Sequence, residues 1–116
     1  MDKKKILAVD DDRTTRYFLE HFIVETGYSP IICEDGEQAI PHIGSADLLI
    51  TDLNMPGING AELTKIAKRE KPDMPVIIIT GDPKGVPVDH LADMVIEKPF
   101  KFERLKEIVA DFLRNK

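Results

Sequence analysis

Four short apolar runs, each followed by a residue that can bind phosphate or metal, constrain the fold of this chain more than any other feature. The runs and the residues that follow them are Ile6–Val9 with Asp10 and Asp11, Leu48–Ile50 with Asp52, Val76–Ile79 with Thr80, and Met94–Ile96 with Lys98. Continuous apolar runs indicate strands buried on both faces, as in a parallel sheet that helices cover. Ligands of such sheets bind beyond the carboxyl ends of the strands. The pattern therefore predicts that three carboxylates, a hydroxyl and an ammonium meet at one edge of a sheet.

Helical signals fill the segments between these runs and one further strand, which we expect at Pro30–Cys33. Asn59 and Glu62 resemble a capping box, and Pro41 should shorten or bend the helix that contains it. The helices are expected from the N-cap Asp12 to about Thr26, at Glu37–Ile43, from Asn59 to just before Lys71, briefly at Val88–Ala92, and at Phe102–Arg114. Right-handed crossovers between five strand–helix units predict an α/β fold, a three-layer α/β/α sandwich.

The length and charge of the chain limit its function class. We expect one domain, residues 1–116, because this is too little chain for a second core. The net charge of −5 argues against direct nucleic-acid binding, which needs a basic face. The lone Cys33 excludes an intramolecular disulfide, and the apolar stretch near the N-terminus is too short for a signal peptide or a membrane span. These features favour a cytoplasmic protein that does not contact the membrane.

Three acidic residues at one edge of a sheet require a cation. Carboxylates about 4 Å apart repel by roughly 4 kcal/mol at an effective dielectric constant near 20, so Asp10, Asp11 and Asp52 cannot share this edge undisturbed. Oxygen ligands with no His or Cys nearby select Mg²⁺ or Mn²⁺. Lys98 adds a positive charge suited to a phosphoryl oxygen, and a carboxylate beside a metal and an ammonium can form an aspartyl phosphate. Together with the Thr80 hydroxyl, these residues indicate phosphoryl transfer.

Four motifs spread over the chain occur together in one known family. They are Val9-Asp10-Asp11-Asp12, the block Asp52-Leu53-Asn54-Met55-Pro56-Gly57-Ile58-Asn59-Gly60, Thr80-Gly81, and Lys98-Pro99-Phe100. Through them the chain resembles the receiver domain of two-component response regulators over essentially its whole length, in the stand-alone, single-domain form. The resemblance implies a flavodoxin-like (CheY-like) fold with a five-stranded parallel sheet in the order 2-1-3-4-5.

The resemblance also implies how the phosphoryl group is handled. Asp52 would accept it from a phosphohistidine, while Thr80 and Lys98 would each bind one of its oxygens. Asn54 and Asp82 stand two places after the acceptor and the threonine, where residues of this family tune the loss of the phosphoryl group. The chain would thus be a signalling protein that catalyses only its own phosphorylation and dephosphorylation.

The same resemblance implies a set of metal ligands. Asp11 would ligate Mg²⁺ (or Mn²⁺) directly and Asp10 mainly through water. Asp52 and the backbone carbonyl of Asn54 would complete the protein ligands.

The chain departs from the usual receiver pattern between Thr80 and Lys98. Many receivers carry an aromatic residue three places before the lysine, and here that residue is Val95. The stretch is also about one helical turn short and rich in glycine and proline. We therefore expect the switch residues to be Thr80, Gly81, Val95 and Pro99, and expect phosphorylation to draw Thr80 inward and reorder residues 81–93.

Two alternatives remain open at this stage. The run Asp10-Asp11-Asp12-Arg13-Thr14 also fits the D-x-D-x-T motif of haloacid-dehalogenase-like phosphatases, in which Asp10 would be the nucleophile and Asp12 the acid/base. The second alternative is a docking module of the same fold that works without phosphate.

The resemblance to receivers implies protein partners. They would be a sensor histidine kinase or a histidine phosphotransfer protein upstream, and a downstream protein target. A phosphorylation-dependent dimer is a further expectation, and no direct contact with nucleic acid is expected.

Overall fold

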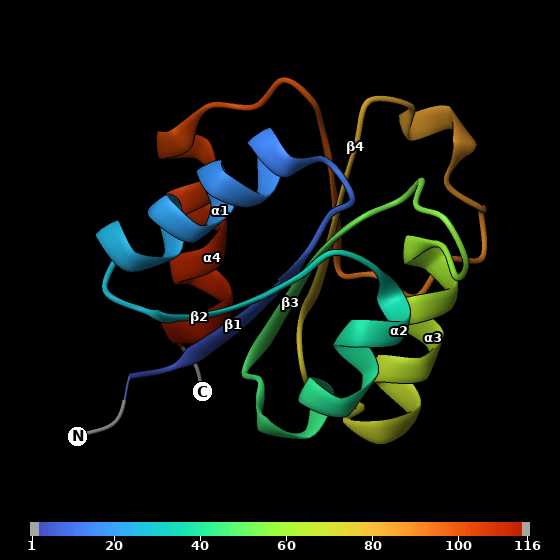
Figure 1. Ribbon diagram of the computed structural model, residues 1–116, viewed down its shortest axis with the longest axis horizontal. Coiled ribbons are helices and arrows are strands. Elements are labelled where there is room, and N and C mark those ends of the chain that lie inside the picture. The colour runs from blue at the N-terminus through green and yellow to red at the C-terminus, as the bar shows by residue number, and fades with distance from the viewer. Residues whose placement is uncertain (1–2, 115–116) are drawn as a thin grey trace.

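A five-stranded parallel sheet forms the centre of the molecule (Figure 1). The computed structural model describes residues 3–114. The strands are β1 (Lys5–Val9), β2 (Ser29–Cys33), β3 (Leu48–Asp52), β4 (Val76–Thr80) and β5 (Met94–Glu97). All neighbouring pairs are parallel, and their order is β2-β1-β3-β4-β5. The predicted order 2-1-3-4-5 is confirmed.

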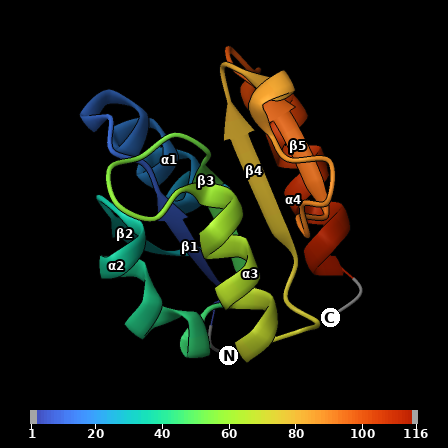
Figure 2. The same cartoon turned by 90° about the vertical axis from the view of Figure 1, so that its right-hand side faces the viewer.

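Helices cover both faces of this sheet and complete the predicted three layers. They are α1 (Arg13–Glu25), α2 (Gly36–Ala39), α3 (Gly60–Glu70) and α4 (Phe102–Arg114), with 3₁₀ turns η1 (Ile40–Ser45) and η2 (Pro83–Gly85). Helices α1 and α4 lie on one face, and α2 and α3 lie on the other (Figures 1 and 2). Within residues 3–114, no helix is both long enough and apolar enough to cross a membrane.

Alternate side chains of the strands build two separate cores. Ile6 and Ala8 of β1 face α1 and α4, whereas Leu7 and Val9 face α2 and α3. All of these side chains are buried, as the continuous apolar runs predict for a sheet covered on both sides. Full burial of each large aliphatic side chain stabilises the fold by about 1.5–3 kcal/mol. Because both faces are covered, a site can form only beyond the ends of the strands.

The predicted helix starts are confirmed by their caps. The Asp12 carboxylate accepts a hydrogen bond from the Thr15 N–H at 2.9 Å and opens α1. At α3, the Asn59 side chain accepts from the Glu62 N–H while the Glu62 carboxylate accepts from the Asn59 N–H, both at 2.9 Å. This reciprocal pair is a complete capping box. Helix α2 ends at Ala39 and continues as η1, the short helix that Pro41 predicts.

The helix expected at Val88–Ala92 does not form. The crossover from β4 to β5 contains only η2 and otherwise irregular chain. Asp93 is tied to the start of β4, because its N–H donates to the Val76 carbonyl and its carboxylate accepts from the Val76 N–H, both at 2.8 Å. Pro87 and this anchor confine the five residues between them, which form no regular helix. The prediction of five strand–helix units is thus wrong at the fourth unit.

Candidate functional site

Three carboxylates converge at the carboxyl edge of the sheet. Asp52 is the last residue of β3, and Asp10 and Asp11 follow β1 directly. One carboxylate oxygen from each residue lies within 4.8 Å of the corresponding oxygens of the other two. Asp10 is 1% exposed and Asp52 8%, whereas Asp11 is open to solvent. The strand pattern therefore placed these three residues correctly, and their hard oxygen atoms suit a divalent cation such as Mg²⁺ or Mn²⁺.

Lys98 brings a positive charge to this cluster from the far end of the chain. Its Nζ donates to Asp10 Oδ2 at 3.1 Å and to Asp52 Oδ1 at 3.3 Å. The Lys98 N–H donates to the Thr80 carbonyl at 2.8 Å, which extends the β4–β5 ladder by one residue and aims the side chain at the acids. The Lys98–Pro99 peptide bond is cis.

Burial and neighbouring charge shift the protonation equilibria of this group. Loss of solvent raises the pKa of Asp52, the negative charge of Asp10 raises it further, and Lys98 opposes both effects. Burial by itself lowers the pKa of Lys98, but the hydrogen bonds and charges of Asp10 and Asp52 outweigh it and raise the value overall. The pair of carboxylates thus keeps the lysine charged, while the lysine limits the repulsion between the carboxylates.

The turn between β1 and α1 orients Asp10. The Asp12 N–H donates to Asp10 Oδ1 at 2.9 Å, so one carboxylate oxygen faces the backbone and the other faces Lys98. Asp12 itself is committed to capping α1, where hydrogen bonds from the N–H and the hydroxyl of Thr15 lower its pKa. The Asp12 carboxylate is therefore a helix cap and lies outside the group of acids that share the cluster.

Gly60 lets α3 begin directly against the end of β3. Its N–H donates to the Leu53 carbonyl at 2.8 Å. A Cβ at this position would stand 2.2 Å from the Asp52 carbonyl oxygen and 3.0 Å from Leu53 Cα. Because these are backbone atoms, no side-chain rotation could relieve the contact. The last glycine of the Asp52-to-Gly60 block is thus required by close packing, a role that spacing alone did not reveal.

Thr80 lies at the same edge with its hydroxyl turned to its own loop. The residue is fully buried, and its Oγ1 accepts from the Asp82 N–H at 2.9 Å. Among residues 3–114, its hydroxyl makes no hydrogen bond to Asp52 or Lys98. Asn54 and Asp82 are exposed in the loops after β3 and β4. Thr80, Asn54 and Asp82 thus lie at or just after the strand ends of this edge, and within residues 3–114 none of them makes a hydrogen bond to the Asp52 carboxylate.

The expected switch residues surround the irregular crossover. Val95 of β5 packs half-buried against a small cluster of Leu53, Ala61 and Ile78. Gly81 and Pro99 are exposed, one after β4 and the other after Lys98. Three of the four expected switch residues thus lie where β4 ends and β5 begins, beside a crossover containing only η2 and irregular chain, and Pro99 lies beyond the other end of β5.

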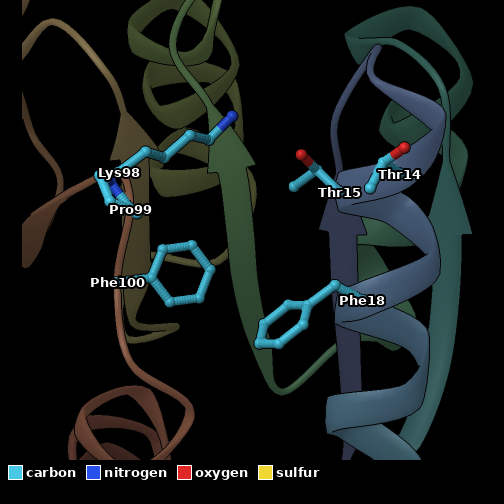
Figure 3. A pocket seen from close by; sticks show the side chains of 6 residues that line it. All are labelled: Thr14, Thr15, Phe18, Lys98, Pro99 and Phe100. Atoms are coloured by element: carbon cyan, nitrogen blue, oxygen red, sulfur yellow. The ribbon is translucent and has the colours of Figure 1, made fainter.

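A hollow of about 440 Å³ opens beside Lys98 (Figure 3). It is lined by Thr14, Thr15 and Phe18 of α1, and by Lys98, Pro99 and Phe100 after β5. Phe18 and Phe100 meet edge-on, with ring centroids 5.4 Å apart. The Lys98 side chain crosses the upper end of this space toward the end of β3 (Figure 3). An incoming group can therefore reach the lysine between α1 and the loop that follows β5.

One contact of the site was missed entirely by the sequence analysis. The Arg16 guanidinium, at the end of the first turn of α1, donates from Nη1 to the Asp10 carbonyl at 2.9 Å. Its position one turn after the N-cap Asp12 was the available signal, because such a residue can reach back over the end of the preceding strand.

Known proteins are similar to this chain in both sequence and fold. Residues 6–110 match the family model described as the response regulator receiver domain. The chain is 32% identical to the response regulator MprA of Mycobacterium avium over 96% of its own length, and it spans 51% of that relative. The chain therefore covers about half the length of the curated relatives it matches.

Solved structures agree over nearly the whole chain. The response regulator TrrA of Thermotoga maritima, in complex with Mg²⁺ and BeF, has 34% identity and a TM-score of 0.83, with 95% of this chain and 99% of that chain covered. A CheY-like receiver domain protein of Methanospirillum hungatei has 26% identity and a TM-score of 0.88, with 98% and 96% covered.

Proposed function

Because this chain belongs to the response regulator receiver domain family, we propose that it works as a phosphoacceptor switch in which Asp52 takes a phosphoryl group from a phosphohistidine. The observation that carries the proposal is the double contact of Lys98 Nζ with Asp10 and Asp52. These three residues come from the ends of three different strands, and each supplies a group that phosphoryl transfer requires. Residues 1–116 would act as one receiver unit.

The carboxylate cluster fits a magnesium ion. Magnesium is usually held by one or two protein carboxylates together with phosphate oxygens and water, and Asp10, Asp11 and Asp52 bring suitable oxygens within 4.8 Å. The complex of the T. maritima relative with Mg²⁺ and BeF supports this assignment. When bound, the ion supplies positive charge to the transferring phosphoryl group. The carbonyl of Asn54 is the further ligand that we propose.

Asp52 would act as the nucleophile. A carboxylate oxygen of Asp52 attacks phosphorus as the bond between phosphorus and the histidine nitrogen breaks, and the electron pair of that bond leaves with the imidazole. The raised pKa of Asp52 makes its ionised carboxylate a stronger base, while the charge of Lys98 favours the ionised form. The product is an aspartyl phosphate on β3.

Lys98 and Thr80 would hold the new phosphoryl oxygens. Lys98 is already in place, since its Nζ lies 3.3 Å from the Asp52 carboxylate. For Thr80 to donate to a phosphoryl oxygen, its hydroxyl must turn away from the Asp82 N–H that it now accepts. Asn54 and Asp82 are exposed in the loops after β3 and β4, and we propose that they tune the rate at which water removes the phosphoryl group.

The same movement of Thr80 would change the crossover after β4. Residues 81–92 are held at one end by the bond between Thr80 and Asp82. At the other end, the Asp93 carboxylate accepts from Lys68 Nζ at 2.7 Å and from the Val76 N–H at 2.8 Å. Loss of the hydrogen bond between Thr80 and Asp82 would let residues 81–92 rearrange, while the bonds of Asp93 keep the far end of the segment in place. Amide exchange that does not change in residues 81–93 after addition of beryllofluoride and Mg²⁺ would contradict this.

The partners follow from the chemistry of the proposed reaction. The phosphoryl donor is a sensor histidine kinase or a histidine phosphotransfer protein, and the phosphorylated form acts on a downstream protein, with dimerisation as one route. Such a receiver turns over no separate substrate. A histidine kinase needs ATP, so we place the reaction in the cytoplasm.

The phosphatase alternative is not favoured by the geometry. It needs Asp12 as a general acid, but the Asp12 carboxylate caps α1 and its pKa is lowered by the Thr15 hydrogen bonds. It also gives no role to the contact between Lys98 and Asp52.

Acetyl phosphate tests the proposed function. Wild-type protein incubated with acetyl phosphate and Mg²⁺ should gain the mass of one phosphoryl group by intact mass spectrometry. Asp52→Asn, or removal of Mg²⁺ with EDTA, should abolish the gain. A wild-type protein that stays unmodified while still binding its partners would instead favour a docking module that works without phosphate.

A further inference from the structure

Arg16 ties three elements together beneath the acidic cluster. Its Nη1 donates to the Asp10 carbonyl at 2.9 Å, and its Nη2 lies 3.6 Å from Glu34 Oε1. The Arg16 side chain is 19% exposed, whereas that of Glu34 is 65% exposed. Helix α1 is thereby joined to the end of β1 and, more loosely, to the residue that follows β2. Because Glu34 is well solvated, the short bond to Asp10 is the stronger of the two contacts.

This bond satisfies a carbonyl that the sheet leaves unpaired. Asp10 follows the last residue of β1 and is almost fully buried. Within residues 3–114, no backbone N–H donates to its carbonyl oxygen, and the guanidinium takes that place. A buried carbonyl without a donor is rare in folded proteins because its desolvation is costly. Arg16 is therefore part of what keeps the turn after β1 in its present conformation.

The carbonyl that Arg16 holds belongs to the peptide unit between Asp10 and Asp11. Since a peptide unit is planar, fixing its oxygen also fixes its N–H and the direction in which the backbone of Asp11 continues. Asp10 is held on its other side by the Asp12 N–H and by Lys98. Asp11 is exposed, and within residues 3–114 its carboxylate accepts no hydrogen bond, so the peptide plane is the main restraint on where that carboxylate stands.

We propose that Arg16 is a positioning residue for the divalent cation, and that it raises the affinity of the site for Mg²⁺ by fixing the peptide between Asp10 and Asp11. The inference rests on the proposed function, because it takes the acidic cluster to be the magnesium site. The positioning effect of Arg16 and its positive charge have opposite effects on the affinity for Mg²⁺. A guanidinium close to the cluster repels a cation, so its loss should tighten Mg²⁺ binding if charge alone mattered, and weaken it if positioning dominates.

The test compares Mg²⁺ binding of wild type, Arg16→Gln, Arg16→Lys and Glu34→Gln by isothermal titration calorimetry. Arg16→Gln should weaken binding about tenfold, the lower end of the effect of removing a partner of a metal ligand. Arg16→Lys keeps the charge but loses the planar fork, and should also weaken binding. Glu34→Gln is the matched control, and it should stay within about twofold of wild type because its ion pair is exposed.

The acetyl phosphate reaction gives a second readout. The Mg²⁺ concentration for half-maximal phosphorylation of Arg16→Gln should rise about tenfold, whereas the rate at saturating Mg²⁺ should stay within about twofold of wild type. Thermal unfolding in EDTA checks that each variant is folded at the assay temperature. If Arg16→Gln does not fold, Arg16→Lys decides.

Equal or tighter Mg²⁺ binding by a folded Arg16 variant would overturn the inference. If the wild type also takes up phosphate on Asp52, the proposed function stands and the positioning role alone fails. Conversely, a wild type that binds Mg²⁺ but accepts no phosphate would refute the proposed function, while a tenfold loss in Arg16→Gln would still support the positioning role.

Discussion

Replacing Gly60 by alanine should disrupt the end of β3 from a position that carries no functional group. The new Cβ would stand 2.2 Å from the Asp52 carbonyl oxygen, where an ordinary contact begins at 3.4 Å. The start of α3 must therefore retreat by about 1 Å, at a typical cost of about 1–3 kcal/mol for an overpacked site. Retreat also weakens the bond from the Gly60 N–H to Leu53, which is worth about 1 kcal/mol.

The higher helix propensity of alanine offsets part of this cost. The gain is at most about 1 kcal/mol, so the net loss should be about 2 kcal/mol. An unfolding entropy of about 2 cal/mol/K per residue makes this a fall in Tm of about 8 °C for a domain of this size. Because β3 carries Asp52 at its end, Mg²⁺ affinity and the rate of phosphorylation should fall as well.

Thermal unfolding by circular dichroism, with Gly44→Ala as the control, checks the reasoning. A Cβ at Gly44 meets only the tip of the Glu70 side chain at 3.1 Å, which can move away at little cost. Gly44→Ala should therefore stay within about 2 °C of wild type. A Gly60→Ala protein as stable as wild type, with unchanged Mg²⁺ affinity, would refute the argument from close packing.

Three further substitutions test the electrostatics and the caps. Asp52→Asn should raise the Tm of the metal-free protein at pH 7. The pKa of Asp52 is higher in the folded than in the unfolded protein. Its contribution to stability is therefore fully present below the unfolded pKa and is lost as the pH rises through the folded pKa. The advantage of the variant in EDTA should accordingly vanish near pH 4, and an advantage that grew toward low pH would contradict the sign. Lys98→Met should cost about 1–3 kcal/mol in EDTA because it leaves Asp10 buried without its cation, and added Mg²⁺ should raise the Tm of this variant more than that of wild type. Asn59→Ala removes half of the α3 capping box and should lower the Tm by about 4 °C without affecting metal affinity, which calorimetry can check.

The features that local sequence dictates were predicted well. The apolar runs identify strands because a strand buried on both faces can carry no polar alternation, and the residue after each run inherits its place at the edge of the sheet. In this way Asp10, Asp11 and Asp52 were brought together correctly. The caps at Asp12 and Asn59 could be read from neighbouring residues because a cap involves a single turn.

The features that depend on distant residues were missed. The helix expected at Val88–Ala92 fails because Asp93 is tied to Val76, a contact between segments that no local pattern reports. The close approach of Gly60 to Asp52 and the bond from Arg16 to Asp10 are likewise distances across the fold. Such contacts determine how exactly the side chains of the site are positioned, whereas the local patterns determine only which side chains lie at the edge of the sheet.

Mapping the phosphoryl group is the most direct test of the account. Wild-type protein phosphorylated with acetyl phosphate in the presence of Mg²⁺ is reduced with borohydride, which converts an aspartyl phosphate to homoserine, and the peptides are sequenced by mass spectrometry. The account predicts homoserine at residue 52 and at no other aspartate. Homoserine at Asp10 or Asp11, with Asp52 intact, would contradict it.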